Sequence, residues 1–224
     1  MDKYKSKVKA EEYAKMSWPN YGGIISEDFY QKISQIIQST VKEINDDNLM
    51  CVEIGFGAGR NIYDLACFSE KVNIIGIENS SNMIDITKLF LKRNLPDYQF
   101  QNQISLQKGS IENIDLNSEV SKFVICINVL DRVINVKKSI KEIFRITEEG
   151  GNILIVNAFD YENKTPKDQR MNIGEMKKYF SKLGGRILLE QEIYLHKKID
   201  FLEKKYNEHL FLIKKERVVL SSKL

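Results

Sequence analysis

The stretch that decides the fold is Glu53-Ile54-Gly55-Phe56-Gly57-Ala58-Gly59-Arg60, which directly follows the apolar residues 50–52. Glycines at alternate positions let the chain turn sharply and let a ligand approach the backbone closely, because no Cβ intervenes. A helix-patterned segment begins at residue 60, so the free N–H groups of its first turn face the same crevice. The stretch therefore predicts a strand, a glycine turn and a helix that together form a ligand site. The GxGxG spacing differs from the GxGxxG of nicotinamide-binding folds.

Outward from this stretch, short apolar runs alternate with helix-patterned segments. The runs lie at 50–54, 72–77, 104–107, 122–127 and 152–156, and the helical patterns at 60–69, 81–93, 136–147 and 172–183. Nearly continuous apolar strands alternating with helices are typical of a parallel sheet covered on both faces. Two more runs, 186–195 and 208–214, have no helical pattern between them and predict an antiparallel pair at one sheet edge.

The N-terminal segment differs in composition from the rest. Residues 1–25 mix lysines with Tyr13, Trp18 and Tyr21, and an amphipathic helix is predicted directly after them. We expect residues 1–25 to form a helical arm or lid and residues 26–224 to form one domain. The alternative is that the aromatic residues of the arm simply pack on the domain surface.

Composition excludes several classes of protein. The 224 residues carry 34 Lys+Arg against 31 Asp+Glu, a net charge of +3, which is too balanced for a dedicated nucleic-acid binder. The hydrophobic fraction of 42% excludes a largely disordered chain. Cys51, Cys67 and Cys126 lie far apart without a CxxC motif, so we expect no disulfide framework and no zinc site. No carboxylate cluster has the spacing of a divalent-metal site.

The cysteine pattern favours a reducing, cytoplasmic location. The longest apolar stretch, 123–130, is too short to cross a bilayer, and the start of the chain lacks the apolar region of a signal peptide. Ser222-Lys223-Leu224 matches the peroxisomal address. We favour a chance match in a lysine-rich tail over that address.

The second strand adds a carboxylate. It ends in Ile77-Glu78, 23 residues after Gly55. An acid about 20 residues after the glycine turn, at the tip of strand two, accepts hydrogen bonds from ribose hydroxyls. Together with the glycines, Glu78 predicts an adenosine site, whereas alone it would be a solvent-facing strand end or a helix N-terminal acid.

The full ordered set resembles the class I S-adenosylmethionine-dependent methyltransferases over roughly residues 25–215. The matching segments are Glu53–Gly59, Glu78, Gly109-Ser110-Ile111-Glu112, Asn128-Val129-Leu130-Asp131-Arg132 and Glu149–Leu154. The resemblance implies an α/β fold, a single Rossmann-like, doubly wound, mostly parallel seven-stranded sheet with an antiparallel strand at one edge. It also implies S-adenosylmethionine as cofactor and S-adenosylhomocysteine as product.

The resemblance further implies a cofactor site. Glu53 and the turn glycines Gly55, Gly57 and Gly59 would surround the methionine part, and Glu78 would hold the ribose. Asn79 and Met83 would flank the adenine, Ser110 and Ile111 would approach its edge, and Asn128 would touch the methionine amine or carboxylate. Ser110 departs from the family, which often has Asp there, but a hydroxyl can also accept a hydrogen bond. The alternatives are that Met83 is a core residue and that Asn128 only caps its loop.

Methyl transfer from a sulfonium depends mainly on positioning and exclusion of water, so no catalytic triad is needed. The acceptor is expected at the loops after strands four and five, where Asp131, Asp160 and Tyr161 are the catalytic candidates. An Asp there would hold an ammonium or imidazolium and accept its proton. The alternatives are an exposed charge pair for Asp131 and Arg132, and a turn-forming role for Asp160.

These features predict a methyltransferase acting on a small molecule or short peptide, with a nitrogen acceptor favoured and no nucleic-acid or membrane partner. Three alternatives stay open. They are an O-methyltransferase, a cofactor-fold binding subunit without turnover, and a nicotinamide-dependent oxidoreductase, which the GxGxG spacing disfavours.

Overall fold

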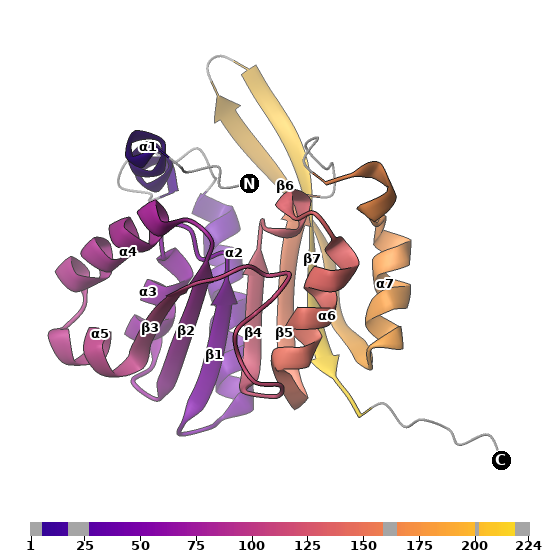
Figure 1. The fold of residues 1–224 in the computed structure, drawn as a ribbon, viewed down its shortest axis with the longest axis horizontal. Coiled ribbons are helices and arrows are strands. Elements are labelled where there is room, and N and C mark those ends of the chain that lie inside the picture. Colours follow the sequence, from indigo (N-terminus) through magenta and orange to yellow (C-terminus); the bar gives the residue numbers. More distant parts are fainter. Residues whose placement is uncertain (1–5, 18–26, 159–164, 200–201, 218–224) are drawn as a thin grey trace.

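A computed structural model describes residues 6–17, 27–158, 165–199 and 202–217. The strands form one seven-stranded sheet in the order β3-β2-β1-β4-β5-β7-β6 (Figure 1). Their bounds are β1 Leu49–Ile54, β2 Val72–Glu78, β3 Ile104–Lys108, β4 Ser121–Ile127, β5 Thr147–Ala158, β6 Gly185–Ile199 and β7 Leu202–Lys215. Strands β1 to β5 pair in parallel, and β7 is antiparallel to both β5 and β6. The predicted fold class is confirmed, with the antiparallel strand β7 lying between β5 and the edge strand β6.

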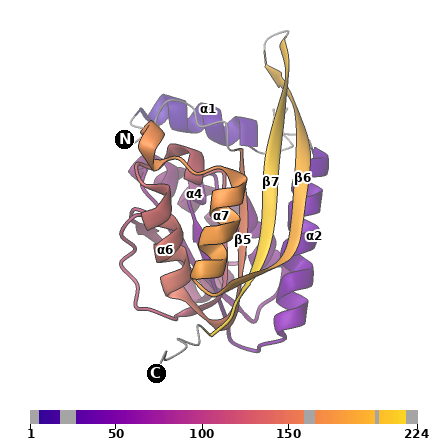
Figure 2. The same cartoon turned by 90° about the vertical axis from the view of Figure 1, so that its right-hand side faces the viewer.

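Helices cover both faces of this sheet (Figures 1 and 2). Their bounds are α1 Lys7–Ser17, α2 Glu27–Ile44, α3 Arg60–Phe68, α4 Ser81–Asn94, α5 Asp97–Gln103, α6 Val136–Ile146 and α7 Ile173–Lys182, with short 3-10 turns η2 Leu130–Arg132 and η3 Lys167–Gln169. Apolar residues of α2, α3 and α4 share a core with Cys51 of β1. Those of α6 and α7 share a core with Val52 and Ile54 on the opposite face. Helix α5 was not predicted, because its sequence DYQFQNQ is short and has no apolar stripe.

None of the described helices is long and apolar enough to span a bilayer.

The described part of the N-terminal segment is the helix α1, which packs on α4. Ala10 and Ala14 are buried there in a small cluster with Ala58 and Met83. Alanine side chains let two helices approach closely, so α1 and α4 are held together by close packing of small residues and bury only a small apolar area. Trp18 and Tyr21 lie outside the described residues.

The β6–β7 hairpin is longer than predicted and projects past the rest of the sheet (Figures 1 and 2). Pairing of β7 with β5 reaches Ala158↔Glu208, whereas pairing of β7 with β6 continues to Ile199↔Leu202. The prediction found the part of the hairpin that pairs with the sheet and missed the projecting part, because residues 196–206 have no regular apolar alternation.

The α1–α4 contact can be tested with two substitutions on one helix. Ala10→Gln puts a long polar side chain into a fully buried position, whereas Val8→Gln changes a side chain that is 61% exposed. We expect Ala10→Gln to release α1, so that trypsin cleaves after Lys9 several times faster than in the wild type, because cleavage requires local unfolding. Val8→Gln should leave the rate unchanged. Equal rates for both variants would show that Ala10 does not hold α1 in place.

Candidate functional site

The glycine turn after β1 is held in a conformation that side chains resist. Gly55, Gly57 and Gly59 have φ of +70°, +52° and +76°, and Gly59 is the N-cap of α3. A Cβ on Gly55 would collide with the Val129 side chain, and one on Gly59 would collide with the Thr87 methyl group. The turn therefore needs glycine both for its left-handed backbone and for its close packing.

Glu78, at the tip of β2, ties this turn to the next strand. One carboxylate oxygen, Oε2, accepts a hydrogen bond from the Gly57 N–H at 3.1 Å. The other, Oε1, accepts from the N–H groups of Asn79 at 2.9 Å and Ser80 at 3.0 Å. Hydrogen bonds to an ionised acceptor are the strong class, so the carboxylate is held in one orientation.

A pocket of about 310 Å³ opens at this carboxyl end of the sheet. It lies between the glycine turn, the ends of β2 and β4, the segment after β3 and Tyr13 of α1. The lining comprises Tyr13, Ile54, Gly55, Gly57, Ile77, Glu78, Asn79, Gly109, Ser110, Ile111, Glu112, Ile127, Asn128, Val129, Arg132, Val133 and Ile134. The volume lies at the lower end of the range for small-molecule sites.

Seven of the predicted cofactor residues meet in this lining: Gly55, Gly57, Glu78, Asn79, Ser110, Ile111 and Asn128. Glu53, Gly59 and Met83 lie behind it, and Met83 is fully buried beneath α1. Among the catalytic candidates, Asp131 is buried outside the lining, and Asp160 and Tyr161 lie outside the described residues.

Sequence reasoning missed part of the wall. Glu112, Val133 and Ile134 had no assigned role, although Glu112 lies within a recognised motif and Val133 directly follows one. Ile134 is 61% exposed at the pocket, and an isolated apolar residue in a loop is not a signal in one sequence.

Glu53 lies buried behind the glycine turn. Its Oε1 accepts a hydrogen bond from the Asn61 side-chain amide at 2.7 Å, and its Oε2 finds no hydrogen-bond partner among the described residues. Burial raises the pKa of the Glu53 carboxyl to about 8, against the lowering effect of the Asn61 hydrogen bond, and the carboxylates of Asp64 and Glu78 raise it further. A cation bound close to Glu53 would favour its charged form.

Asn128, directly after β4, has a φ of +56°. Its backbone N–H donates to the Val156 carbonyl oxygen at 2.8 Å, which fixes this left-handed residue against β5. Asn tolerates this conformation better than other residues with a Cβ, and backbone strain of this kind clusters at functional sites.

The turn η2 carries the pair Asp131 and Arg132. The Arg132 Nε donates to the Asp131 carboxylate at 3.3 Å, and Arg132 contributes to the pocket lining. The Thr165 hydroxyl donates to the Val133 carbonyl at 2.6 Å, and Arg170 donates to the Thr165 carbonyl at 2.9 Å. These bonds fasten the segment after β4 to the chain that follows β5. Asp131 is 9% exposed, so it is not the exposed charge considered as an alternative.

Across the described ranges, no three His, Cys, Asp or Glu side chains come together in a way that could hold a metal ion.

The chain matches a known domain family. Residues 52–155, from β1 to β5, match the family described as "Methyltransferase domain". A comparison with curated protein sequences gives no significant match.

Solved structures show the same fold at low identity. YcgJ from Bacillus subtilis is 14% identical, with a TM-score of 0.63 over 82% of this chain and 98% of that chain. An S-adenosylmethionine-dependent methyltransferase from Aquifex aeolicus is 13% identical, with a TM-score of 0.61 over 92% and 98%. The [4+2]-cyclase SpnF is 10% identical, with a TM-score of 0.68 over 94% and 96%.

The matched domain spans β1 to β5 and contains every pocket-lining residue named above except Tyr13. Residues 52–155 therefore match a methyltransferase domain, in agreement with the predicted resemblance, and the solved structures show the same fold over most of the chain.

The packing around Gly59 generates a prediction with an internal control. Gly59 and Gly150 both have a φ of +76°, but a Cβ on Gly150 would meet nothing within 4 Å. We expect Gly150→Ala to cost about 1–2 kcal/mol from the left-handed backbone alone. Gly59→Ala should cost clearly more in denaturant unfolding, because the Cβ also strikes Thr87.

The Thr87 methyl group can then be removed separately. The Thr87 hydroxyl donates to the Gly57 carbonyl at 2.8 Å, and serine retains this hydroxyl. Thr87→Ser should therefore recover part of the stability lost in Gly59→Ala. Equal losses for Gly59→Ala and Gly150→Ala would contradict the steric argument.

The raised pKa of Glu53 predicts a pH-dependent stability. The folded-state pKa of about 8 exceeds 4.5, the ordinary value for a glutamic acid, so between these values the folded state binds more protons than the unfolded state. The contribution of Glu53 to the free energy of unfolding therefore falls as pH rises from about 5 to 8, by at most about 1.4 kcal/mol per pH unit. Glu53→Gln removes this titration. Urea unfolding at several pH values should show the variant gaining stability relative to wild type with rising pH, and parallel curves would refute the assignment.

Proposed function

We propose that the protein transfers a methyl group from S-adenosylmethionine to a nitrogen of a small molecule or short peptide. The observation that carries the cofactor part is that the exposed backbone of Gly55 and Gly57 and the Glu78 carboxylate line the same pocket. Bare backbone accommodates a closely approaching ligand, and a carboxylate at the tip of the second strand accepts hydrogen bonds from ribose hydroxyls.

The residues of the pocket fit the three parts of this cofactor. Glu78 would hold the ribose, and Asn79, Ser110 and Ile111 would contact the adenine, Ile111 through its backbone N–H. Asn128, with Glu53 behind the turn, would face the methionine part, where the ammonium and sulfonium charges favour an ionised Glu53.

Gly59 and Met83 would contribute from behind the lining. Gly59 would contribute as the N-cap of α3, and Met83 as the surface on which α1 sits.

Bound S-adenosylmethionine supplies an electrophilic sulfonium methyl group, which a lone pair of the acceptor attacks in line. The protein's part is positioning and exclusion of water. Tyr13 supports this role, because its ring would lie 3.4 Å from a Cβ built on Gly57, directly over the turn. We therefore propose that residues 1–25 act as a lid on the domain of residues 26–224, with the Tyr13 ring facing the cationic sulfur.

The acceptor would enter over the ends of β4 and β5. Asp131 would hold an acceptor ammonium and take its proton, aided by Asp160 and Tyr161, which follow β5 in the sequence. Asn157, at the end of β5, is fully buried, and its Oδ1 has no hydrogen-bond partner among the described residues. Buried polar atoms of this kind at a sheet's carboxyl end favour a polar acceptor.

The cofactor part is tested by calorimetric titration of S-adenosylhomocysteine. Wild type should bind it, and Glu78→Ala should bind at least about 10-fold more weakly, because a hydrogen bond to a charged group is lost. Glu190→Ala is the control, since Glu190 pairs with Lys177 on the surface, away from the pocket. Absence of binding to wild type would refute the proposal.

The acceptor part is tested by incubating the protein and S-adenosylmethionine with matched amine and alcohol acceptors and measuring the S-adenosylhomocysteine that forms from the donor. Turnover with amines and none with the corresponding alcohols would support a nitrogen acceptor. Turnover with alcohols alone would identify an O-methyltransferase. Cofactor binding without turnover on any acceptor would favour a binding subunit.

A further inference from the structure

The segment between β3 and β4 supplies one wall of the pocket without being a helix or a strand. Gly109, Ser110, Ile111 and Glu112 all contribute to the lining. Within the segment, the Asn113 N–H donates to the Ser110 carbonyl at 3.0 Å, and a single bridge joins the same two residues. Such a short turn does not by itself fix the position of residues 109–112 in the pocket wall, so contacts with other elements must fix it.

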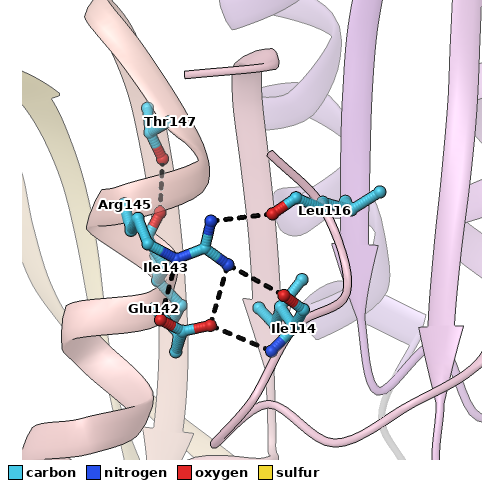
Figure 3. Close-up of polar contacts among 6 residues, drawn as sticks. All are labelled: Ile114, Leu116, Glu142, Ile143, Arg145 and Thr147. Atoms are coloured by element: carbon cyan, nitrogen blue, oxygen red, sulfur yellow. Dashed lines mark hydrogen bonds and ion pairs between the residues drawn. The ribbon is translucent and has the colours of Figure 1, made fainter. Parts of the chain in front are cut away.

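Arg145, on α6, fastens this segment from behind (Figure 3). Its Nη1 donates to the Leu116 carbonyl at 2.7 Å, and its Nη2 donates to the Ile114 carbonyl at 2.8 Å. Its Nε and Nη2 also donate to the two carboxylate oxygens of Glu142, each at 2.8 Å. One guanidinium group therefore holds two loop carbonyls and one carboxylate at the same time, a pattern that its planar set of donors allows.

Glu142 closes the arrangement from the other side. Its Oε2 accepts a hydrogen bond from the Ile114 N–H at 2.9 Å, so both polar groups of Ile114 bond to α6 (Figure 3). The hydrogen bond from Arg145 lowers the pKa of the Glu142 carboxyl, which keeps the pair ionised. Ile114 itself is 4% exposed and packs in the core cluster that contains the apolar face of α6.

A second tie joins the pocket end of the segment to the start of α6. The Asn135 N–H donates to the Glu112 carboxylate at 2.8 Å, and Asn135 is the N-cap of α6. Both ends of the wall are thus anchored to one helix. Neither Arg145 nor Glu142 contributes to the pocket lining.

We propose that Arg145, oriented by Glu142, is a positioning residue that sets the base specificity of the cofactor site. This inference rests on the proposed cofactor site, in which Ser110 and the Ile111 N–H meet the edge of the adenine. The hydrogen bonds at Ile114 and Leu116 determine the positions of Ser110 and of the Ile111 N–H. Hydrogen bonds recognise a base edge only when their donors and acceptors lie at the correct distance. Arg145 acts only through the segment that it holds.

Lysine cannot replace this arginine. A single ammonium group is a compact point charge without the planar fork that reaches two carbonyls and a carboxylate together. Arg145→Lys retains the positive charge beside Glu142 but leaves one or both loop carbonyls without their donor. Arg145→Met retains most of the length of the side chain and removes every donor.

The test compares two ligands on each variant by calorimetry. S-adenosylhomocysteine and S-inosylhomocysteine differ at the base edge, where the inosine carries a carbonyl in place of the adenine amino group. Wild type should prefer the adenosyl compound. In Arg145→Met the adenosyl affinity should fall about 10-fold or more, and the inosyl affinity should fall less, so the preference shrinks toward unity. Arg145→Lys should show the same loss of preference in weaker form.

Arg186→Met is the matched control, because Arg186 also forms an ion pair with a glutamate, Glu216, but lies on β6 outside the pocket lining. It should leave both affinities unchanged. A lowered melting temperature with an unchanged ratio of the two affinities in Arg145→Met would overturn the proposal, because a purely structural residue would behave in this way. If Arg145→Met does not fold, Arg145→Lys takes its place. An unchanged ratio of the adenosyl and inosyl affinities in Arg145→Lys would then overturn the proposal. Failure of wild type to bind either ligand would refute the cofactor site itself, independently of Arg145.

Discussion

The carboxylate of Glu78 accepts hydrogen bonds from three backbone N–H groups, and the pocket is built around this contact. It joins the glycine turn after β1 to the end of β2, so two neighbouring strands present their ends in a fixed relation. Burial of a carboxylate is costly unless several donors meet it, and here backbone groups of the turn and of the start of α4 provide them. The same backbone arrangement makes glycine necessary at positions 55, 57 and 59.

Much of the fold was predictable from the pattern of apolar residues. Strands buried on both faces appear in the sequence as continuous apolar runs, and amphipathic helices appear as apolar residues at helical spacing. The antiparallel pair at the end of the sheet followed from the absence of a helix between two runs. Helix α5 and the outer part of the β6–β7 hairpin were not predicted, since neither has a regular pattern of apolar residues. Their conformations depend on contacts that a local pattern does not encode.

The site was predictable to the extent that its residues belong to recognisable motifs. Gly55, Gly57, Glu78, Ser110 and Asn128 meet in one pocket because the carboxyl ends of parallel strands share one edge of the sheet. The anchoring role of Arg145 was not predictable, because a charged residue near the end of a helix usually faces solvent. Its bonds to Ile114 and Leu116 join residues about 30 positions apart and exist only in the folded chain.

Among the residues that the structure describes, those that line the pocket come from Tyr13 to Ile134. The described side chains of the β6–β7 hairpin are not among them, although the hairpin completes the sheet beyond β5. The pocket lining and the described C-terminal part of the chain thus place separate requirements on the sequence. Within the described residues, the hairpin can therefore vary in sequence without changing a side chain that lines the pocket, while the glycine turn and the Glu78 carboxylate stay as they are.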